Sequence, residues 1–247
     1  MMDNDAKSTF SHFIQDLIFK HENGKGRTIH LEKLCKVSSI EKRRLSDLFS
    51  VLCSLNVCTK ICNQCFRWNS MGNVRSTLYN TAVQLEERSR IQTITDLFDA
   101  NGSPPIGELS IKLIEVFLFF GESEMSLPII ARLLSPKPEK TKQVLRRVYL
   151  AAYFLEQFNI LSHGSERGVY IFVHDTGDIM LHALNIISQN NDPSTSLLPL
   201  LSRIDRQYLY SVKVVRKKIM DEYLHRPSAI NEPYNFKMRK YGYIENE

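Results

Sequence analysis

The sequence predicts a mainly α-helical protein with small β-hairpins, an α+β fold made of two tandem copies of one unit and a helical C-terminal segment. Three observations predict this fold. Apolar residues recur at helical spacing along most of the chain, short extended runs follow the third helix of each copy, and one order of apolar positions occurs twice. With 247 residues, the chain is long enough for two small domains that each bury a core.

The duplication is clearest around two adjacent arginine pairs. When Arg43 is placed on Arg146, the segments RRLSDLFSVLCSLNV and RRVYLAAYFLEQFNIL match in the order of their apolar residues. The same offset places Phe10 on Leu113, and TIHLEKL aligns with EMSLPII if the longer loop LSPKPEK of the second copy absorbs the difference in length. The chain is therefore interpreted as a tandem duplication.

Each copy is predicted to contain three helices followed by two extended runs. The first helices cover 9–21 and 107–121, and short second helices cover 31–37 and 127–134. The third helices hold the arginine pairs. The extended runs are VCTKI and CFRWN in the first copy and NILSH and VYIFVH in the second, where the glycine-bounded turn GSERG suits a hairpin. Three helices followed by a hairpin is the order of a winged helix-turn-helix.

The rest of the chain divides at changes in composition. The segment DANGSPP breaks the pattern before the second copy, and helices are expected at 177–190 and 199–225. The predicted domains are a first winged-helix domain at 9–70, a partly helical linker at 71–105, a second winged-helix domain at 106–175, a helical C-terminal segment at 176–226 and a flexible tail at 227–247.

The last predicted helix carries an apolar stripe with cations outside it. The stripe comprises Ile204, Tyr208, Val212, Val215, Ile219 and Tyr223, and the cations are Arg206, Lys213, Arg216, Lys217 and Lys218. This helix is expected to pack on the winged-helix units or to form a short coiled coil with a protein partner. The clusters VRKK and KMRK are candidate nuclear-import signals.

The arginine pairs are the candidate functional residues. At 100° per residue, Arg43 lies opposite the core face of its helix and shares this outward face with Ser46, Asp47, Ser50 and Ser54. Lys42 and Arg44 flank the core side, and Arg146 takes the outward position in the second copy, next to Arg147. Both pairs are expected in the first turns of their helices, where the helix dipole disfavours cations. This arrangement, made twice, indicates that the charges face a negative partner, although a lone arginine pair is most often a solvated surface.

Double-stranded DNA is the partner that this arrangement favours. In a helix-turn-helix the residues near the start of the third helix reach base edges in the major groove, and arginine binds guanine O6 and N7 with two parallel hydrogen bonds. In the predicted hairpins, Lys60, Arg67 and Arg167 are candidate phosphate contacts. The net charge of +5 is compatible with a polyanion but does not require one.

At these residues the chain resembles a known family. RRLSDLFSVLCSLNV with FRWNSMG, and RRVYLAAYFLEQFNIL with SERGVYIFVH, resemble the third helix and wing of the E2-promoter-binding factor and dimerisation-partner transcription factors. Two such modules in one chain resemble the atypical members, which bind DNA without a separate partner subunit.

The resemblance implies roles for particular residues. It assigns base reading to Arg43, Arg44, Arg146 and Arg147 and motif positions to Asp47 and Tyr149. Ser46 stands where the family has tyrosine, and Leu150 stands where it has aspartate. With Tyr149 and Tyr153, Leu150 makes an apolar outward patch, which would suit thymine methyls or another protein.

The expected function is that of a nuclear, sequence-specific, DNA-binding transcription regulator. The resemblance implies repressor-like regulation, possibly of cell-cycle genes, through GC-containing promoter sites bound by two winged helices acting as an intramolecular pseudo-dimer. The alternative is a winged-helix scaffold or a subunit of a nuclear complex that binds protein partners and has weak or non-specific affinity for DNA.

Other classes of function receive less support from the sequence. The scattered histidines form no nucleophile–base set, so we expect no enzyme and no cofactor. Five cysteines include one Cys-x-x-Cys pair, at Cys62 and Cys65, without a second pair at zinc-site spacing; we expect reduced thiols and no metal, with Cys58 left open as a further ligand. No apolar run is long enough for a membrane span.

Overall fold

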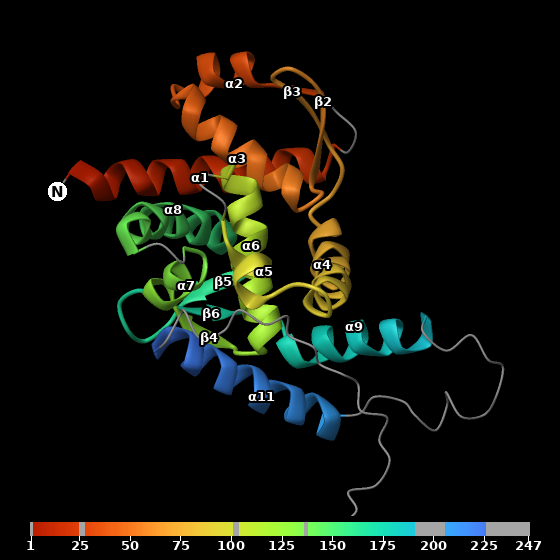
Figure 1. Ribbon diagram of the computed structural model, residues 1–247. Coiled ribbons are helices and arrows are strands. Elements are labelled where there is room, and N and C mark those ends of the chain that lie inside the picture. The colour runs from red at the N-terminus through yellow and green to blue at the C-terminus, as the bar shows by residue number, and fades with distance from the viewer. Residues whose placement is uncertain (1, 25–27, 101–103, 136–137, 191–205, 226–247) are drawn as a thin grey trace, which may run out of the picture.

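The computed structural model describes residues 2–24, 28–100, 104–135, 138–190 and 206–225. In these residues the protein is mainly helical and contains two small antiparallel sheets of three strands each, so the predicted α+β class is confirmed. Figure 1 shows the first sheet and its helices above the second, with one helix, α6, running between them. The predicted tail at 227–247 and the cluster KMRK lie outside the described residues.

The order helix, strand, helix, helix, strand, strand occurs twice. In the first half it comprises α1 (Met2–Glu22), β1 (Thr28–His30), α2 (Leu31–Ser38), α3 (Lys42–Ser54), β2 (Cys58–Cys62) and β3 (Cys65–Trp68). In the second half it comprises α6 (Ile106–Phe120), β4 (Glu124–Ser126), α7 (Leu127–Leu133), α8 (Pro138–Gln157), β5 (Leu161–His163) and β6 (Val169–Phe172). Helices α4 (Asn73–Ser89) and α5 (Ile94–Phe98) separate the halves, and α9 (Thr176–Asn190) and α11 (Arg206–His225) follow them.

Each sheet adds a strand that the sequence analysis does not predict. The strand orders are β1-β3-β2 and β4-β6-β5, so β1 and β4 extend the predicted hairpins from the side. Each added strand has three residues, with one buried side chain, Ile29 or Met125, opposite Phe66 or Tyr170. A single buried residue between two exposed or half-buried ones is too short a pattern for alternation to be recognised.

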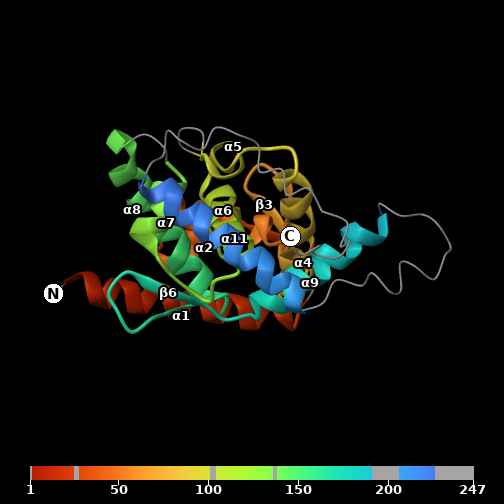
Figure 2. The same cartoon turned by 60° about the horizontal axis from the view of Figure 1, so that its bottom comes forward.

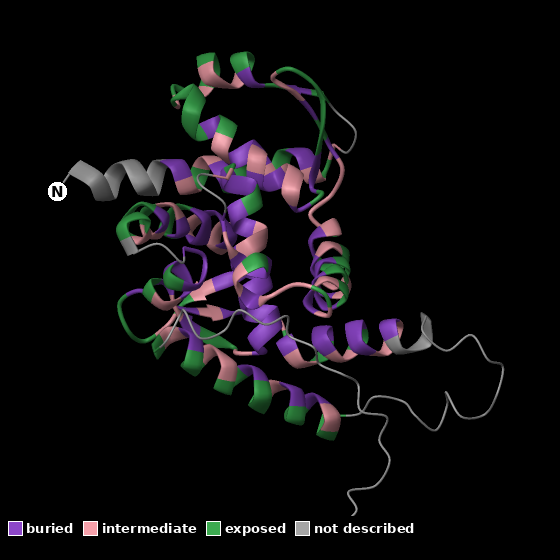
Figure 3. Cartoon of the chain, viewed as in Figure 1, coloured by how far each residue is buried: buried purple, intermediate pink, exposed green. Residues whose placement is uncertain are grey.

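Helix α6 is the centre of the molecule. It is apolar on nearly all sides, which is typical of a fully buried helix, and it packs against α3, α4, α8, α9 and α11. Figure 3 shows it buried along most of its length. One continuous apolar cluster includes Phe49 of the first half, Phe117 of α6 and Phe154 of the second half. The two halves therefore share one core.

Helices α3 and α6 approach very closely at Gly107. The Gly107 amide donates a hydrogen bond of 3.2 Å to the Ser50 hydroxyl, and a Cβ atom at position 107 would lie 2.3 Å from the Ser50 carbonyl oxygen. The sequence analysis assigned the face with Ser50 to the outside of α3. That assignment is wrong for the C-terminal half of the helix, because a small residue on each helix allows α6 to cover it.

Helix α8 begins earlier than the sequence analysis supposed. Its first residue is Pro138, a residue favoured at the first helical position, so part of the expected loop LSPKPEK is helical. Arg146 and Arg147 consequently lie in the third turn of α8 rather than in its first turns. The argument from an unfavourable helix dipole holds for Arg43 and Arg44 and is wrong for the second pair.

Helix α11 lies across the side of the molecule opposite α3, against α6, α9 and α7, as Figure 2 shows from below. Its buried face comprises Leu209, Val212, Arg216 and Tyr223, whereas Val215 is 38% exposed. The packing expected for this helix is confirmed. The places given to Val215 in the apolar stripe and to Arg216 among the cations outside it are wrong.

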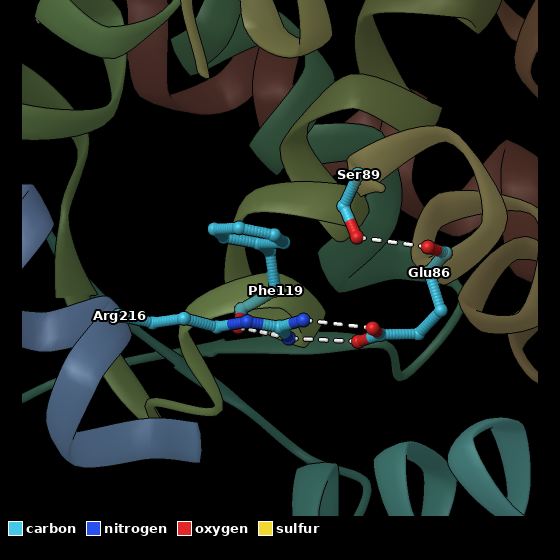
Figure 4. Close-up of polar contacts among 4 residues, drawn as sticks. All are labelled: Glu86, Ser89, Phe119 and Arg216. Atoms are coloured by element: carbon cyan, nitrogen blue, oxygen red, sulfur yellow. Dashed lines mark hydrogen bonds and ion pairs between the residues drawn. The ribbon is translucent and has the colours of Figure 1, made fainter. Parts of the chain in front are cut away.

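Arg216 is buried with hydrogen-bond partners for both terminal nitrogens of its guanidinium group. Its guanidinium donates two hydrogen bonds of 2.7 Å to the two carboxylate oxygens of Glu86 and one of 2.9 Å to the Phe119 carbonyl oxygen. Its Cζ atom also lies 4.0 Å from the centre of the Phe119 ring. Figure 4 shows the paired Arg216 and Glu86 side chains with Phe119. Arg216 and Glu86 are 2% and 7% exposed. The bidentate pair thus joins α11 to α4, and the bond to the Phe119 carbonyl oxygen joins α11 to α6.

We predict that Gly107→Ala destabilises the protein by about 1–3 kcal/mol, because the added methyl group would meet backbone atoms of α3 that cannot move independently. Urea unfolding measures the loss. Gly72→Ala is the matched control, since its Cβ would lie 3.3 Å from the end of the Ser70 side chain. Equal stability of both variants would contradict the close approach of α3 and α6.

Removing one partner of the buried ion pair is predicted to be costly. Glu86→Ala should destabilise the protein by about 3–5 kcal/mol, because it leaves the Arg216 charge buried without a counter-charge. The double variant Glu86→Leu with Arg216→Met should recover much of this loss. The pair of exposed Lys217 and half-buried Glu122, at 3.4 Å, supplies the control: Glu122→Ala should change the free energy of unfolding by less than about 1 kcal/mol.

Candidate nucleic-acid interface

The start of α3 presents three exposed cations. Lys42, Arg43 and Arg44 occupy its first turn, and no acidic residue lies in that turn. Lys42 forms a long ion pair of 3.9 Å with Glu32 of α2, and both side chains are more than half exposed. Exposed pairs of this kind contribute little to stability. In the part of the chain that the structure describes, this end of α3 is therefore a positively charged surface.

Phe10 connects this surface to α8. The Arg44 guanidinium lies 5.5 Å from the centre of the Phe10 ring, and that ring stacks on Tyr153 of α8 with the ring centres 6.3 Å apart. A second link comes from the Gln15 side chain on α1, which donates a hydrogen bond of 3.1 Å to the Gln157 carbonyl oxygen. Helix α1 thus lies against both arginine helices.

The two arginines of α8 differ in their surroundings. Arg146 is exposed. Arg147 is half-buried and donates a hydrogen bond to the Pro104 carbonyl oxygen, in the segment just before α6. The expectation that both pairs point outward is wrong for Arg147. Its guanidinium holds a backbone oxygen near the start of the central helix.

Asp47 lies between the two arginine pairs. Its carboxylate is close enough to Arg43 on its own helix and to Arg147 on α8 for both charges to act on it. Burial is the largest effect and raises the pKa of Asp47 above its usual value of 3.8, while the two arginines act in the opposite direction. A charge in the first turn of α3 and a charge in the third turn of α8 therefore act on the same carboxylate.

Tyr149 lies against the turn of the second hairpin. Its hydroxyl would be 2.7 Å from a Cβ atom at Gly168, a residue with φ of +82°, so only glycine fits that turn beside the ring. Arg167, the neighbouring residue in the turn, is exposed. Tyr149 and Leu150 are each 39% exposed, which leaves an apolar surface next to Arg146.

A hydrogen-bonded chain fastens the second hairpin to α8. His163 Nδ1 lies 2.5 Å from a Glu156 carboxylate oxygen, and His163 Nε2 lies 3.0 Å from the Tyr170 hydroxyl. The order of carboxylate, imidazole and hydroxyl is that of a catalytic triad. However, Tyr170 is only 5% exposed, and burial raises the pKa of its hydroxyl to about 12. These three hydrogen-bonded side chains therefore hold the hairpin in place, and the Tyr170 hydroxyl is not an accessible nucleophile.

The predicted phosphate contacts of the first hairpin do not lie on one face. Arg67 is opposite Thr59 and Lys60 is opposite Phe66, so Arg67 and Lys60 project from opposite faces of the sheet. Both side chains are exposed. The structure therefore brings together Arg43, Asp47 and Arg147, and separates Lys60 from Arg67.

The sequence analysis missed two candidates. Lys142 and Gln143 are exposed in the second turn of α8, nearer to its start than Arg146. Pro138, followed by the acidic Glu139, was the signal for an early helix start. In a helix that enters the major groove with its N-terminal turns, Lys142 and Gln143 would precede Arg146.

Comparison with protein-family models, with curated proteins and with solved structures finds no match to this chain. In the described part of the chain, no group of three or more His, Cys, Asp or Glu residues is arranged to hold a metal ion. None of the helices, as far as the structure describes them, is long and apolar enough to cross a membrane.

Asp47→Asn is predicted to leave the protein at least as stable as the wild type. A carboxyl group whose folded-state pKa is raised favours the unfolded chain once it ionises, so the variant should gain stability relative to the wild type as the pH rises above the usual Asp pKa of 3.8. Thermal unfolding across this range measures the difference. Asp221→Asn, on the exposed side of α11, is the control, and a loss of stability on replacing Asp47 alone would show that its charge is needed.

Proposed function

We propose that the protein is a sequence-specific, double-stranded-DNA-binding regulator of transcription, in which each half of the chain acts as a winged-helix unit. The repeated order of three helices, two hairpin strands and one added strand supports this proposal. In each half the third helix is followed directly by the hairpin, which would place α3 and α8 as the recognition helices and the hairpins as wings.

The exposed guanidinium groups on α3 and α8, two helices in contact with one another, carry the proposal. Arg43, Arg44 and Arg146 are all exposed, and none of them forms an ion pair with a carboxylate in the described residues. Arginine is the side chain best suited to bind guanine edges and phosphates through two parallel hydrogen bonds. Three such groups, two on α3 and one on α8, would suit a polyanion with a regular edge pattern because the two helices are in contact.

The proximity of α3 and α8 bears on the form of the DNA site. Packed helices have axes about 8–10 Å apart, whereas the recognition helices of helix-turn-helix dimers lie about 34–36 Å apart on the duplex. Because α3 and α8 are in contact, the two arginine helices would read one short, continuous stretch. The proposed pseudo-dimer would therefore not bind two half-sites one helical turn apart.

The resemblance to the E2-promoter-binding factor and dimerisation-partner transcription factors supports the same proposal and adds a context. It implies a nuclear protein with repressor-like action on GC-containing promoters, possibly those of cell-cycle genes. Its arginines correspond to Arg43, Arg44, Arg146 and Arg147, of which Arg147 would act by positioning α8 rather than by reading bases. We assign the protein no catalytic role.

The test begins with selection of duplexes from a random library by the wild-type chain. The double variant Arg43→Lys with Arg146→Lys keeps both charges but removes both planar guanidinium groups, which make the two parallel hydrogen bonds. It should retain affinity for random DNA and lose about 1–3 kcal/mol of preference for the selected site per arginine. Competition binding against random duplex measures this preference.

The control is Arg75→Lys with Arg206→Lys, which makes the same exchange at exposed arginines of α4 and α11. It should leave the preference unchanged. The proposal is wrong if the preference survives in the α3 and α8 variant, or if the wild type selects no sequence.

A protein-binding scaffold is the second candidate function. The half-exposed Tyr149 and Leu150 on α8 and the 73% exposed Phe19 on α1 favour it, since apolar side chains of this size gather at protein interfaces. Added salt separates the two functions. Binding through several phosphate contacts weakens steeply with salt concentration, whereas binding through apolar contacts does not.

A further inference from the structure

The tip of the first hairpin brings two cysteines together. Cys62 ends β2 and Cys65 begins β3, and the turn between them has two residues, Asn63 and Gln64. The strand register is regular from Cys58 to Lys60 and then shifts, so that Ile61 is left over as a bulge and Cys62 lies opposite Cys65. Without this bulge, Ile61 would take that place.

The opposed position suits a covalent bond between the two sulfur atoms. Directly opposed residues of an antiparallel pair point to the same face, with Cα atoms about 4.5–5.5 Å apart. A disulfide needs Cα atoms about 4.4–6.8 Å apart, so the hairpin backbone already has the required spacing. The neighbouring Cys62 thiol is also the main cause that raises the pKa of Cys65.

His30 completes a row of three side chains across the sheet. Its strand β1 pairs with β3 so that His30 lies opposite Cys65 on the side away from Cys62. His30 Nδ1 is 3.2 Å from the Cys65 sulfur. An imidazole at this distance can accept the thiol proton when Cys65 reacts.

The other cysteines have different surroundings. Cys58 is buried and Cys53 is half-buried, and burial raises the pKa of both thiols, which favours the unreactive protonated form. Cys62, by contrast, is exposed. Among the five cysteines of the chain, accessibility and a neighbouring thiol coincide at the hairpin tip.

We propose that Cys62 and Cys65 form a reversible disulfide when the protein meets a hydroperoxide. The Cys62 thiolate attacks the peroxide, its sulfur is oxidised to sulfenic acid, and the oxygen–oxygen bond breaks to release water or an alcohol. Cys65 then gives its proton to His30 and attacks the Cys62 sulfur, and the sulfenic oxygen leaves as water. Two thiols are oxidised and the peroxide is reduced; a dithiol restores both thiols by exchange.

The test uses the folded wild-type chain, treated with hydrogen peroxide, then denatured and alkylated with N-ethylmaleimide. Oxidised protein should take up two fewer alkyl groups than reduced protein. Trypsin cleaves after Lys60 and Arg67 and so releases both cysteines in the peptide ICNQCFR. That peptide should lack alkyl groups, weigh two hydrogen atoms less than its reduced form, and become alkylatable again after dithiothreitol treatment.

Two controls make the result specific. Cys62→Ser should leave Cys65 reduced or bonded to an external thiol, and Cys53→Ser should still form the hairpin disulfide. Alkylation of both hairpin cysteines in peroxide-treated wild type, or conversion of Cys62 to sulfinic acid without a disulfide, would overturn the proposal.

The role of His30 is tested separately by the rate. His30→Gln should form the disulfide more slowly than the wild type at the same peroxide concentration. His12→Gln, an exposed histidine of α1, should not change the rate. Equal rates of disulfide formation in all three proteins would show that His30 does not accept the Cys65 proton. The mass of the tryptic peptide tests the disulfide itself independently of this result.

Discussion

The burial of α6 between the two halves of the chain is the constraint on which the rest of the structure depends. This helix is apolar on nearly all sides and is therefore stable only when other helices surround it. Helix α3 reaches it from the first half and α8 from the second. The close approach at Gly107 sets the height of α3 along α6. The two arginine helices meet because they share this support.

The outer layer of the molecule closes the same core from the other side. The ion pair of Arg216 with Glu86 takes two charges out of water, and the Phe119 carbonyl oxygen and ring provide further contacts. Such a pair adds little net stability but strongly disfavours alternative positions of α11, since either charge alone would be costly to bury. The ion pair thereby holds α11 against the other helices of this chain.

The helices and both hairpins could be predicted from the sequence because apolar periodicity depends on neighbours along one element. The contacts between the halves could not. The pattern of α3 gives Ser50 and Arg43 the same outward face, and only the three-dimensional packing shows that α6 covers the first and leaves the second exposed. The prediction for Arg216 was wrong for the same reason. Its position among other cations in the sequence is typical of a surface residue, and its partner Glu86 lies on a helix that is distant in the sequence. In the candidate site, the exposed Arg43, Arg44 and Arg146 match the prediction, whereas the engagement of Arg147 with Pro104 has no local signal.

The central claim is that α3 and α8 act as one surface on DNA. Hydroxyl-radical footprinting of the wild-type chain on its selected duplex tests this claim most directly, because the cleavage pattern shows which sugars the protein covers. One continuous protected stretch, centred on the selected sequence, is the result that contact between the helices predicts. Two protected segments separated by about one helical turn of free DNA, or uniform cleavage, would contradict it.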